Sequence, residues 1–210
     1  AMALRFVMLA MLIAVTAASC SDSVMDPDDR VGYNRTPAPD VSQTVFIDYS
    51  TDPSGAAFSP VANEGELILV YFGFLSCPDV CPTTLAELSD ALDAMPEEDA
   101  ARIAVAMVSV DPDRDEGPAI STYLDVFAER NHGLLAPDAA SLAQTPEFFG
   151  VLYEVEDHEP GDTSYDVGHS ATVYVVDDRG LIVWELGFSA DRNPQLTADT
   201  LESILIERYE

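Results

Sequence analysis

Two long apolar runs divide the chain into alternating segments. The first, 67–74, reads L-I-L-V-Y-F-G-F and predicts a strand that is buried on both faces. Apolar residues then recur at helical spacing over Pro82–Met95, which predicts a helix. The second run, 103–110, predicts another buried strand, and a helix over Pro118–Arg130 follows it. This order indicates β-α-β units built around parallel strands.

Shorter segments on either side extend this pattern. Thr44–Tyr49 is expected to be a short edge strand, with Phe58–Val61 as its hairpin partner. Together the segments predict an α/β fold of the thioredoxin-like type, with a mixed central sheet, helices on both faces and an N-terminal hairpin extension. The other expected elements are a strand at Gly133–Ala136, a short helix at Asp138–Phe149 broken at Pro146, a strand at Val151–Val155, a hairpin of Ala171–Val176 with Leu181–Leu186, and a terminal helix at Leu196–Tyr209.

The first 20 residues have the pattern of a signal peptide. One cation, Arg5, precedes the apolar run Phe6–Val15, which is short for a membrane span. Small residues then lead to Cys20 and are similar to a bacterial lipobox, so we expect residues 1–20 to be a lipoprotein signal and Cys20 to carry lipid. Cleavage without lipidation and an uncleaved anchor are the alternatives. Every version places the folded domain outside the cytoplasm, on the outer side of the cell membrane.

A polar segment separates this signal from the predicted domain. Residues 21–42 are rich in Asp and Pro and show no hydrophobic period, so we expect a flexible linker. The predicted thioredoxin-like domain then spans residues 43–210. We find no internal repeat.

The charge balance excludes one large class of functions. Asp and Glu number 38 against 9 basic residues, all of them Arg, and the formal net charge is −29. Such a chain would repel phosphates, so nucleic-acid binding is excluded. Because the acidic residues are spread through all segments, we favour adaptation to high salt over a dedicated docking face for a basic partner.

Two cysteines lie in the turn between the central strand and the helix after it. In an open parallel sheet the carboxyl ends of the strands are where ligands bind. Cys77 and Cys81 each precede a proline, so we expect both to be extended or turn-like, with Cys81 at the helix N-cap and Pro82 at the first helical position. The helix N-terminus would then lower the pKa of the Cys81 thiol. Three intervening residues suit a metal loop and exceed the C-x-x-C spacing by one.

The chain has three histidines, and a lone histidine is more often structural than a ligand. His132 is expected in a helix-ending turn, where the helix dipole accounts for it. His158 lies in an acidic loop and is expected to pair with Asp157 or Glu159. His169 lies at the entry to the last hairpin, and its residue type and position leave its role open.

An acidic loop, Asp111–Asp115, follows the second buried strand. If the strands are parallel, this loop should lie on the same sheet edge as the cysteines. A carboxylate there could be an outer metal ligand or a partner contact. We favour a simpler role at the N-terminus of the next helix.

Three segments together resemble the Sco/SenC family. The loop F-G-F-L-S-C-P-D-V-C-P-T-T-L resembles the metal loop of that family, and V-S-V-D-P-D-R-D and D-V-G-H-S-A-T-V-Y-V-V-D fit as well. The resemblance extends from about Val41 to the C-terminus. Sco/SenC proteins are membrane-anchored copper proteins with a thioredoxin fold that assist assembly of cytochrome c oxidase. The resemblance implies that Cys77, Cys81 and His169 bind copper, as Cu(I), Cu(II) or both.

One position departs from the family pattern. The residue before the ligand histidine is commonly Asp in the family, whereas Gly168 stands here and Asp166 lies two positions earlier. The hydrogen bonding around the imidazole is therefore expected to be looser.

Two functions from different classes remain open at this point. The resemblance implies a metallochaperone that delivers copper to, or prepares the thiols of, the two-copper site of cytochrome c oxidase subunit II. Its other partners would be a thiol reductant or copper-donor protein and the membrane. The alternative is a thiol–disulfide oxidoreductase without a physiological metal, in which Cys77 and Cys81 are the redox-active thiols. A third ligand at His169 distinguishes the two. A peroxiredoxin fits less well, because no Arg lies near either cysteine in the sequence.

Overall fold

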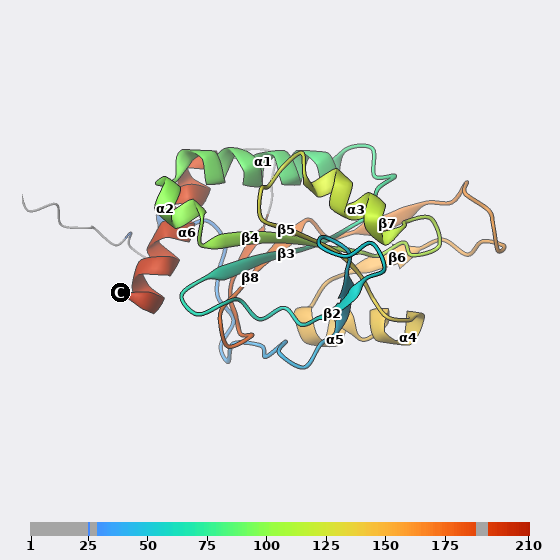
Figure 1. Cartoon of the computed structure of the whole chain (residues 1–210), viewed down its shortest axis with the longest axis horizontal. Helices are drawn as coiled ribbons and strands as arrows, with labels where there is room; N and C mark the ends of the chain where they lie inside the picture. Colours follow the sequence, from blue (N-terminus) through green and yellow to red (C-terminus); the bar gives the residue numbers. More distant parts are fainter. Residues whose placement is uncertain (1–24, 26–28, 188–192) are drawn as a thin grey trace, which may run out of the picture.

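A mixed sheet runs through the middle of the computed structural model (Figure 1). The structure describes residues 25, 29–187 and 193–210, and within them seven strands form this sheet in the order β2-β1-β5-β4-β3-β8-β9. At its centre β3 (Leu67–Gly73) pairs in parallel with β4 (Ile103–Ser109) and antiparallel with β8 (Thr172–Val176). Every residue of β3 and β4 is buried. The two apolar runs therefore form the expected buried strands.

The outer strands correct one prediction. β1 (Phe46–Asp48) pairs on one side with β2 (Ala56–Phe58) and on the other with β5 (Asn131–Leu135), so β1 is interior and β2 is the edge strand. The predicted partner segment was two residues too far along the chain, because the register aligns Phe46 with Phe58. At the opposite edge β9 (Ile182–Gly187) pairs antiparallel with β8.

Helices cover both faces of the sheet, as predicted. In Figure 1, α1 (Val80–Ala94) and α3 (Gly117–Leu124) lie above it, and α4 (Ala139–Leu142) and α5 (Thr145–Phe149) lie below. The C-terminal α6 (Pro194–Tyr209) packs against α1, and the short α2 (Glu97–Ala100) follows α1 in the chain.

Two predicted helices have different boundaries. The helix expected over Pro118–Arg130 ends at Leu124, and the chain then turns toward β5, where the Asn131 side chain donates to the carbonyl of Ala128. The helix expected over Asp138–Phe149 is divided before Pro146 rather than at it. Pro146 lies in the first turn of α5, where a missing N–H costs nothing.

The segment expected to be a free linker is packed from residue 29 onward. Tyr33 forms a β-bridge to Glu185 of β9, Asp40 forms one to Leu181 just before β9, and Val41 is fully buried. The Arg30 guanidinium is buried against α6, where it donates to Ser203 and forms an ion pair with Glu207. The prediction of a flexible spacer is therefore wrong for residues 29–42. Cys20 lies outside the described residues.

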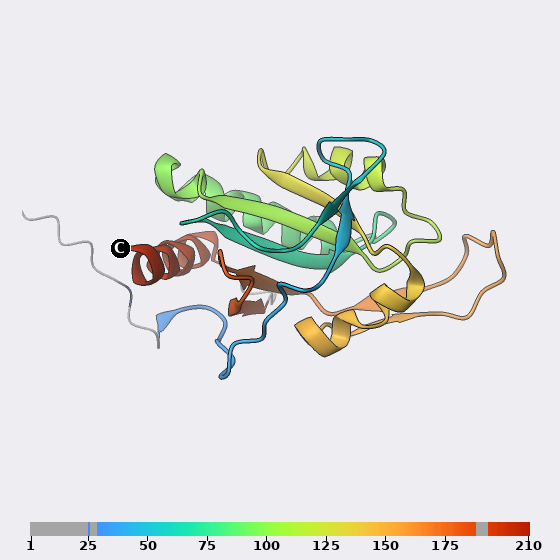
Figure 2. The same ribbon diagram turned by 60° about the horizontal axis from the view of Figure 1, so that its bottom comes forward.

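The hairpin of β6 (Tyr153–Val155) and β7 (Val167–His169) forms a second, two-stranded sheet. Residues 156–166 connect the two strands and project from the body of the molecule, as Figure 2 shows in orange. This hairpin carries His169 into the main domain.

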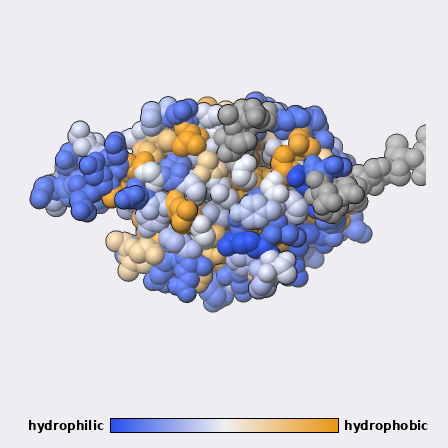
Figure 3. Space-filling view, turned by 180° about the vertical axis from the view of Figure 1, so that it is seen from behind, coloured by the Kyte–Doolittle hydropathy of each residue, from blue (hydrophilic) through white to orange (hydrophobic). Residues whose placement is uncertain are grey.

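Polar side chains dominate the face seen in Figure 3, where apolar residues form small separate groups. Among the described residues, the exposed large apolar side chains include Val126 and Leu152. No helix in the described part of the chain has the length and hydrophobicity needed to span a membrane.

Candidate metal centre

Cys77 and Cys81 follow β3 at its carboxyl end, as predicted, but helix α1 begins earlier than predicted. Asp79 occupies the N-cap position, so Cys81 is the second helical residue and is not the cap. The Asp79 side chain forms no capping hydrogen bond, and the Cys81 N–H donates instead to Cys77 Sγ at 3.3 Å. The first sulfur therefore satisfies one of the free N–H groups at the start of the helix.

The Cys81 thiol is fully buried, and this reverses the predicted direction of its pKa. Burial raises the pKa of Cys81 to about 12, although the Tyr71 hydroxyl and the Phe74 N–H act to lower it. Loss of hydration therefore outweighs the helix N-terminus. In the metal-free reduced protein Cys81 is a neutral thiol.

His169 is the last residue of β7. We had expected it in the loop at the entry to the last hairpin. Its Nε2 atom lies 3.2 Å from Cys81 Sγ and 3.9 Å from Cys77 Sγ. Its Nδ1 atom lies 3.1 Å from the carbonyl oxygen of Ser170, which can only accept, so Nδ1 carries the proton. Burial lowers the pKa of His169 and keeps the ring neutral. The free lone pair of Nε2 therefore points at the two sulfurs.

The three donor atoms lie within 4.8 Å of one another. Among the described residues this is the one group of three or more potential ligands close enough to hold an ion. Two sulfurs and one imidazole nitrogen form a soft donor set that fits copper or zinc and not magnesium or calcium. A structural zinc site usually has four ligands, so three ligands fit an ion that is exchanged.

The acidic loop lies at this sheet edge, as predicted, but its carboxylates are occupied. Asp115 is buried and accepts hydrogen bonds from Ser109 Oγ at 2.7 Å and from the Leu75 N–H at 3.1 and 3.2 Å. Burial raises the pKa of Asp115. The N-cap of α3 is Glu116, without a capping side-chain bond, so our simpler explanation is also wrong. Asp115 fixes the start of the cysteine loop.

The same loop also holds the hairpin that carries His169. Asp111 is almost completely buried, accepts from the Tyr165 hydroxyl at 2.5 Å and pairs with Arg114 at 2.5 Å. The Arg114 guanidinium lies 3.8 Å from the centre of the Tyr165 ring and donates to the backbone carbonyls of Tyr165 and Thr163. Residues 111–115, which we call the bracket loop, thus connect both arms of the site. Sequence reasoning missed this role, because it depends on partners about 40 to 50 positions away.

The other two histidines lie elsewhere and have partners that differ from our predictions. His132 is in β5, not in a helix-ending turn, and its Nδ1 atom lies 2.8 Å from a carboxylate oxygen of Asp48. His158 pairs with Asp113 at 3.1 Å, not with a sequence neighbour, and stacks on the Tyr165 ring at 3.7 Å. Both therefore have structural explanations.

A family model described as SCO1/SenC matches residues 41–205. The chain belongs to the SCO1/SenC family. Curated relatives of this SCO1/SenC protein include a SCO2-like protein of Rickettsia conorii, 30% identical over 129 residues, which are 61% of this chain and 62% of the relative. The human mitochondrial SCO2 homologue is 30% identical over 62% of this chain and 48% of its own length. The match thus spans about half to three fifths of the length of these relatives.

Solved structures of SCO1/SenC relatives share the fold. ScoI of Bradyrhizobium japonicum, solved with copper bound, is 30% identical with a TM-score of 0.60, and the alignment covers 86% of this chain and 99% of that one. The metal-free Sco1 of Thermus thermophilus is 27% identical with a TM-score of 0.62, covering 84% and 93% of the two chains. These likenesses agree with the predicted thioredoxin-like fold.

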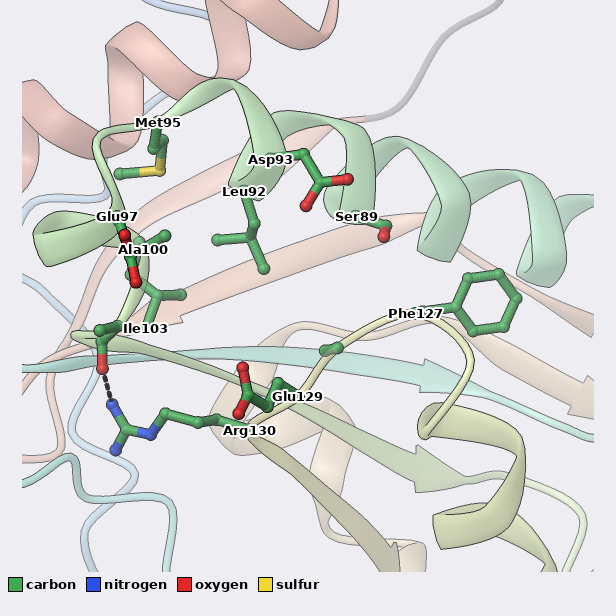
Figure 4. Close-up of a pocket in the computed structure, with 12 residues that line it drawn as sticks. Ser89, Leu92, Asp93, Met95, Glu97, Ala100, Ile103, Phe127, Glu129 and Arg130 are labelled. Carbon is green, nitrogen blue, oxygen red and sulfur yellow. Dashed lines mark hydrogen bonds between the residues drawn. The ribbon is translucent and has the colours of Figure 1, made fainter.

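A hollow of about 490 Å³ lies at the other end of α1 in this SCO1/SenC protein. Leu92 and Ile103 are among the apolar residues that line it, and Asp93, Glu97 and Glu129 lie around it (Figure 4). None of the three metal-site residues lines this hollow, so it is separate from the candidate metal centre.

Proposed function

We propose that this SCO1/SenC protein is a copper metallochaperone that acts outside the cytoplasm. Cys77, Cys81 and His169 bind the copper ion, and the protein delivers it to, or prepares the thiols of, the two-copper site of cytochrome c oxidase subunit II. The observation that carries this proposal is the convergence of two free thiols and one unprotonated imidazole nitrogen within 4.8 Å. The copper-bound state of the Bradyrhizobium japonicum relative supports it.

The protonation state of the site controls copper uptake. Cys81 is a neutral thiol in the metal-free protein, and copper binds the thiolate, so loading releases protons. Copper affinity should therefore fall as the pH falls. His169 is already neutral and offers Nε2 without losing a proton.

The three ligands should contribute unequally to the two oxidation states of copper. Thiolate is the softer donor, and two thiolates can hold Cu(I) without a third ligand. Cu(II) prefers imidazole nitrogen in its coordination sphere. We therefore expect His169→Ala to weaken Cu(I) binding and abolish Cu(II) binding, and each cysteine replacement to cost more.

A thiol–disulfide oxidoreductase is the second candidate, supported by the proximity of two free thiols. In such a reaction the dithiol loses two electrons and two protons to a disulfide of the partner protein, which becomes a dithiol. A thiol reductant would then return Cys77 and Cys81 to the reduced form. Copper loading requires that reduced form, so both activities can share one site.

The anchor at Cys20 is part of the proposal and rests on the sequence pattern. Lipid on Cys20 would hold the domain at the outer face of the cell membrane, close to the oxidase. We expect Cys20→Ser to release the protein from membranes or to block its processing. Intact-mass analysis of membrane-extracted protein checks this, and an unlipidated N-terminus at another residue would contradict it.

The deciding experiment is an anaerobic titration of the reduced protein with Cu(I) and with Cu(II). We expect one copper ion per chain and a thiolate-to-Cu(II) absorption band that is lost in both cysteine variants and altered in the histidine variant. Replacement of His132, which pairs with Asp48 away from the cysteines, is the matched control and should leave the titration unchanged. If the wild-type protein binds no copper but readily reduces a disulfide substrate, the second candidate is correct.

A further inference from the structure

Two hydroxyl groups beside the metal centre lack hydrogen bonds. The side chains of Tyr71 and Thr84 are both completely buried. Within the described part of the chain, neither the Tyr71 hydroxyl nor Thr84 Oγ1 has a hydrogen-bond partner. Buried polar groups are nearly always paired, since an unpaired one destabilises the folded state. Two unpaired hydroxyls in one place therefore require an explanation.

Both groups lie against Cys81. Tyr71 and Gly73 project from the same face of β3 because they are two residues apart. A Cβ atom at Gly73 would lie 2.9 Å from Cys81 Sγ and 2.9 Å from the Tyr71 ring, so the sulfur and the ring border the same small space. Thr84 lies one turn after Cys81 on α1. The Tyr71 and His169 rings also pack in a T-shaped arrangement, with centroids 5.8 Å apart.

The chemistry of the sulfur decides which form of Cys81 these hydroxyls favour. A phenol and a threonine hydroxyl each have one O–H group to donate. A neutral thiol is a weak acceptor, whereas a thiolate is a strong one.

We propose, resting on the copper site proposed above, that Tyr71 is a positioning residue whose hydroxyl donates a hydrogen bond to the metal-bound thiolate of Cys81. Thr84 Oγ1 donates in turn to the Tyr71 oxygen. The Tyr71 hydroxyl is already in place in the metal-free protein and gains a strong acceptor when Cys81 binds the metal ion as a thiolate. The unpaired hydroxyls therefore destabilise the metal-free protein, and their hydrogen bonds stabilise the metal-bound protein.

This role gives one substitution two opposite effects. Tyr71→Phe removes only the hydroxyl and keeps the ring that packs on His169. The metal-free reduced protein should then be as stable as the wild type or more stable, because a buried unpaired group is gone. Affinity for Cu(I) should fall by about 10-fold to 100-fold, as is typical when an outer partner of a metal ligand is removed. If Tyr71 had a packing role alone, its replacement would not lower Cu(I) affinity while keeping or raising metal-free stability.

The test measures Cu(I) affinity by anaerobic competition with a chromophoric chelator, and metal-free stability by urea unfolding under reducing conditions. Tyr174→Phe is the matched control, since Tyr174 is also buried but packs against Phe72 and Phe149 on the other face of the sheet. It should leave Cu(I) affinity unchanged. The thiolate-to-Cu(II) band should shift in Tyr71→Phe and stay in place in Tyr174→Phe.

Thr84→Val provides an independent variant of nearly equal volume. We expect a smaller loss of Cu(I) affinity, about threefold to tenfold, because Thr84 acts through Tyr71. The double variant should bind Cu(I) no more weakly than Tyr71→Phe alone, since the Thr84 effect requires the Tyr71 hydroxyl. If the losses of Cu(I) affinity in the two single variants add up in the double variant, Thr84 does not act through Tyr71.

Two results would overturn the role of Tyr71. One is a Tyr71→Phe protein that binds Cu(I) within twofold of a wild type that itself binds one copper ion. The other is an equal loss of affinity in Tyr71→Phe and Tyr174→Phe, which would indicate packing. A wild-type protein that binds no copper would instead contradict the proposed function.

Discussion

Two clusters of buried polar groups lie at the carboxyl ends of the central strands β3 and β4. They differ in whether their polar groups have hydrogen-bond partners. In the bracket loop, Asp111 and Asp115 accept from a guanidinium, two hydroxyls and a backbone N–H. At the metal centre, Cys81, Tyr71 and Thr84 are equally buried, yet both hydroxyls are unpaired. Paired groups stabilise the fold. The neutral ligands at the metal centre remain available for an ion, and the unpaired hydroxyls remain available for the thiolate that binds it.

The difference assigns separate roles to residues that are equally buried. The bracket loop determines the distance between the two arms of the site, because Asp115 holds Leu75 and Arg114 holds Tyr165. The metal centre uses that distance to bring three donors together. Substitutions in the bracket loop should therefore reduce stability first, and substitutions at the centre should reduce copper binding first.

The largest expected effect comes from breaking the paired cluster. Arg114→Met leaves the Asp111 carboxylate buried without its cation, and this should lower the free energy of unfolding by about 3–5 kcal/mol. Urea unfolding of the reduced metal-free protein measures the loss. Asp113→Ala is the control from the same loop, since Asp113 is exposed, and it should change stability by less than about 0.5 kcal/mol. Equal effects of the two would contradict the bracket role.

A smaller effect is expected where the two clusters meet, at the end of β3. In Gly73→Ala the new Cβ atom would meet Cys81 Sγ and the Tyr71 ring at 2.9 Å, and overpacking of this kind costs about 1–3 kcal/mol. The displaced sulfur should also alter the thiolate-to-Cu(II) absorption band. Gly168→Ala, beside His169, has open space around its new Cβ atom and should leave both the stability and the band unchanged. An unaltered band in Gly73→Ala would contradict the close approach of Gly73 to Cys81 Sγ.

Removing a ligand should cost metal-free stability less than removing a member of the bracket loop. Cys77→Ala loses one hydrogen bond from the Cys81 N–H, so the free energy of unfolding should fall by about 1 kcal/mol or less. The same variant should lose the thiolate-to-Cu(II) band. Urea unfolding and copper titration of one sample measure both quantities. A loss of stability as large as that of Arg114→Met would remove the distinction between the clusters.

The smallest expected effects concern pH. Burial lowers the pKa of His169 from 6.5, so the unfolded chain binds a proton more readily and His169 reduces stability as the pH falls below 6.5. The Glu156 carbonyl, with Asp113, raises the pKa of His158, so His158 adds stability at low pH and that contribution is lost as the pH rises through its folded pKa. Imidazole NMR titration of the metal-free protein should give opposite shifts. Shifts in one direction for both rings would contradict these environments.

The sequence alone determined the two central strands of the main sheet and the candidate metal donors. Two apolar runs predicted β3 and β4, because a strand buried on both faces needs continuous hydrophobic residues. The C-x-x-x-C loop and the family resemblance indicate Cys77, Cys81 and His169 as candidate ligands, and the fold brings their donor atoms within 4.8 Å of one another. These features depend on local pattern and residue chemistry, which a sequence contains directly.

Tertiary structure decided the properties that depend on surroundings. Local reasoning placed Cys81 at a helix N-cap with a lowered pKa, but the packing of α1 on the sheet buries the sulfur and raises that pKa. It treated Asp111–Asp115 as helix-capping residues, but their partners include Leu75, which follows β3, and Tyr165 in the hairpin that carries His169. Burial and long-range hydrogen bonds depend on how distant segments meet, and the spacing of residues along one chain does not contain that information.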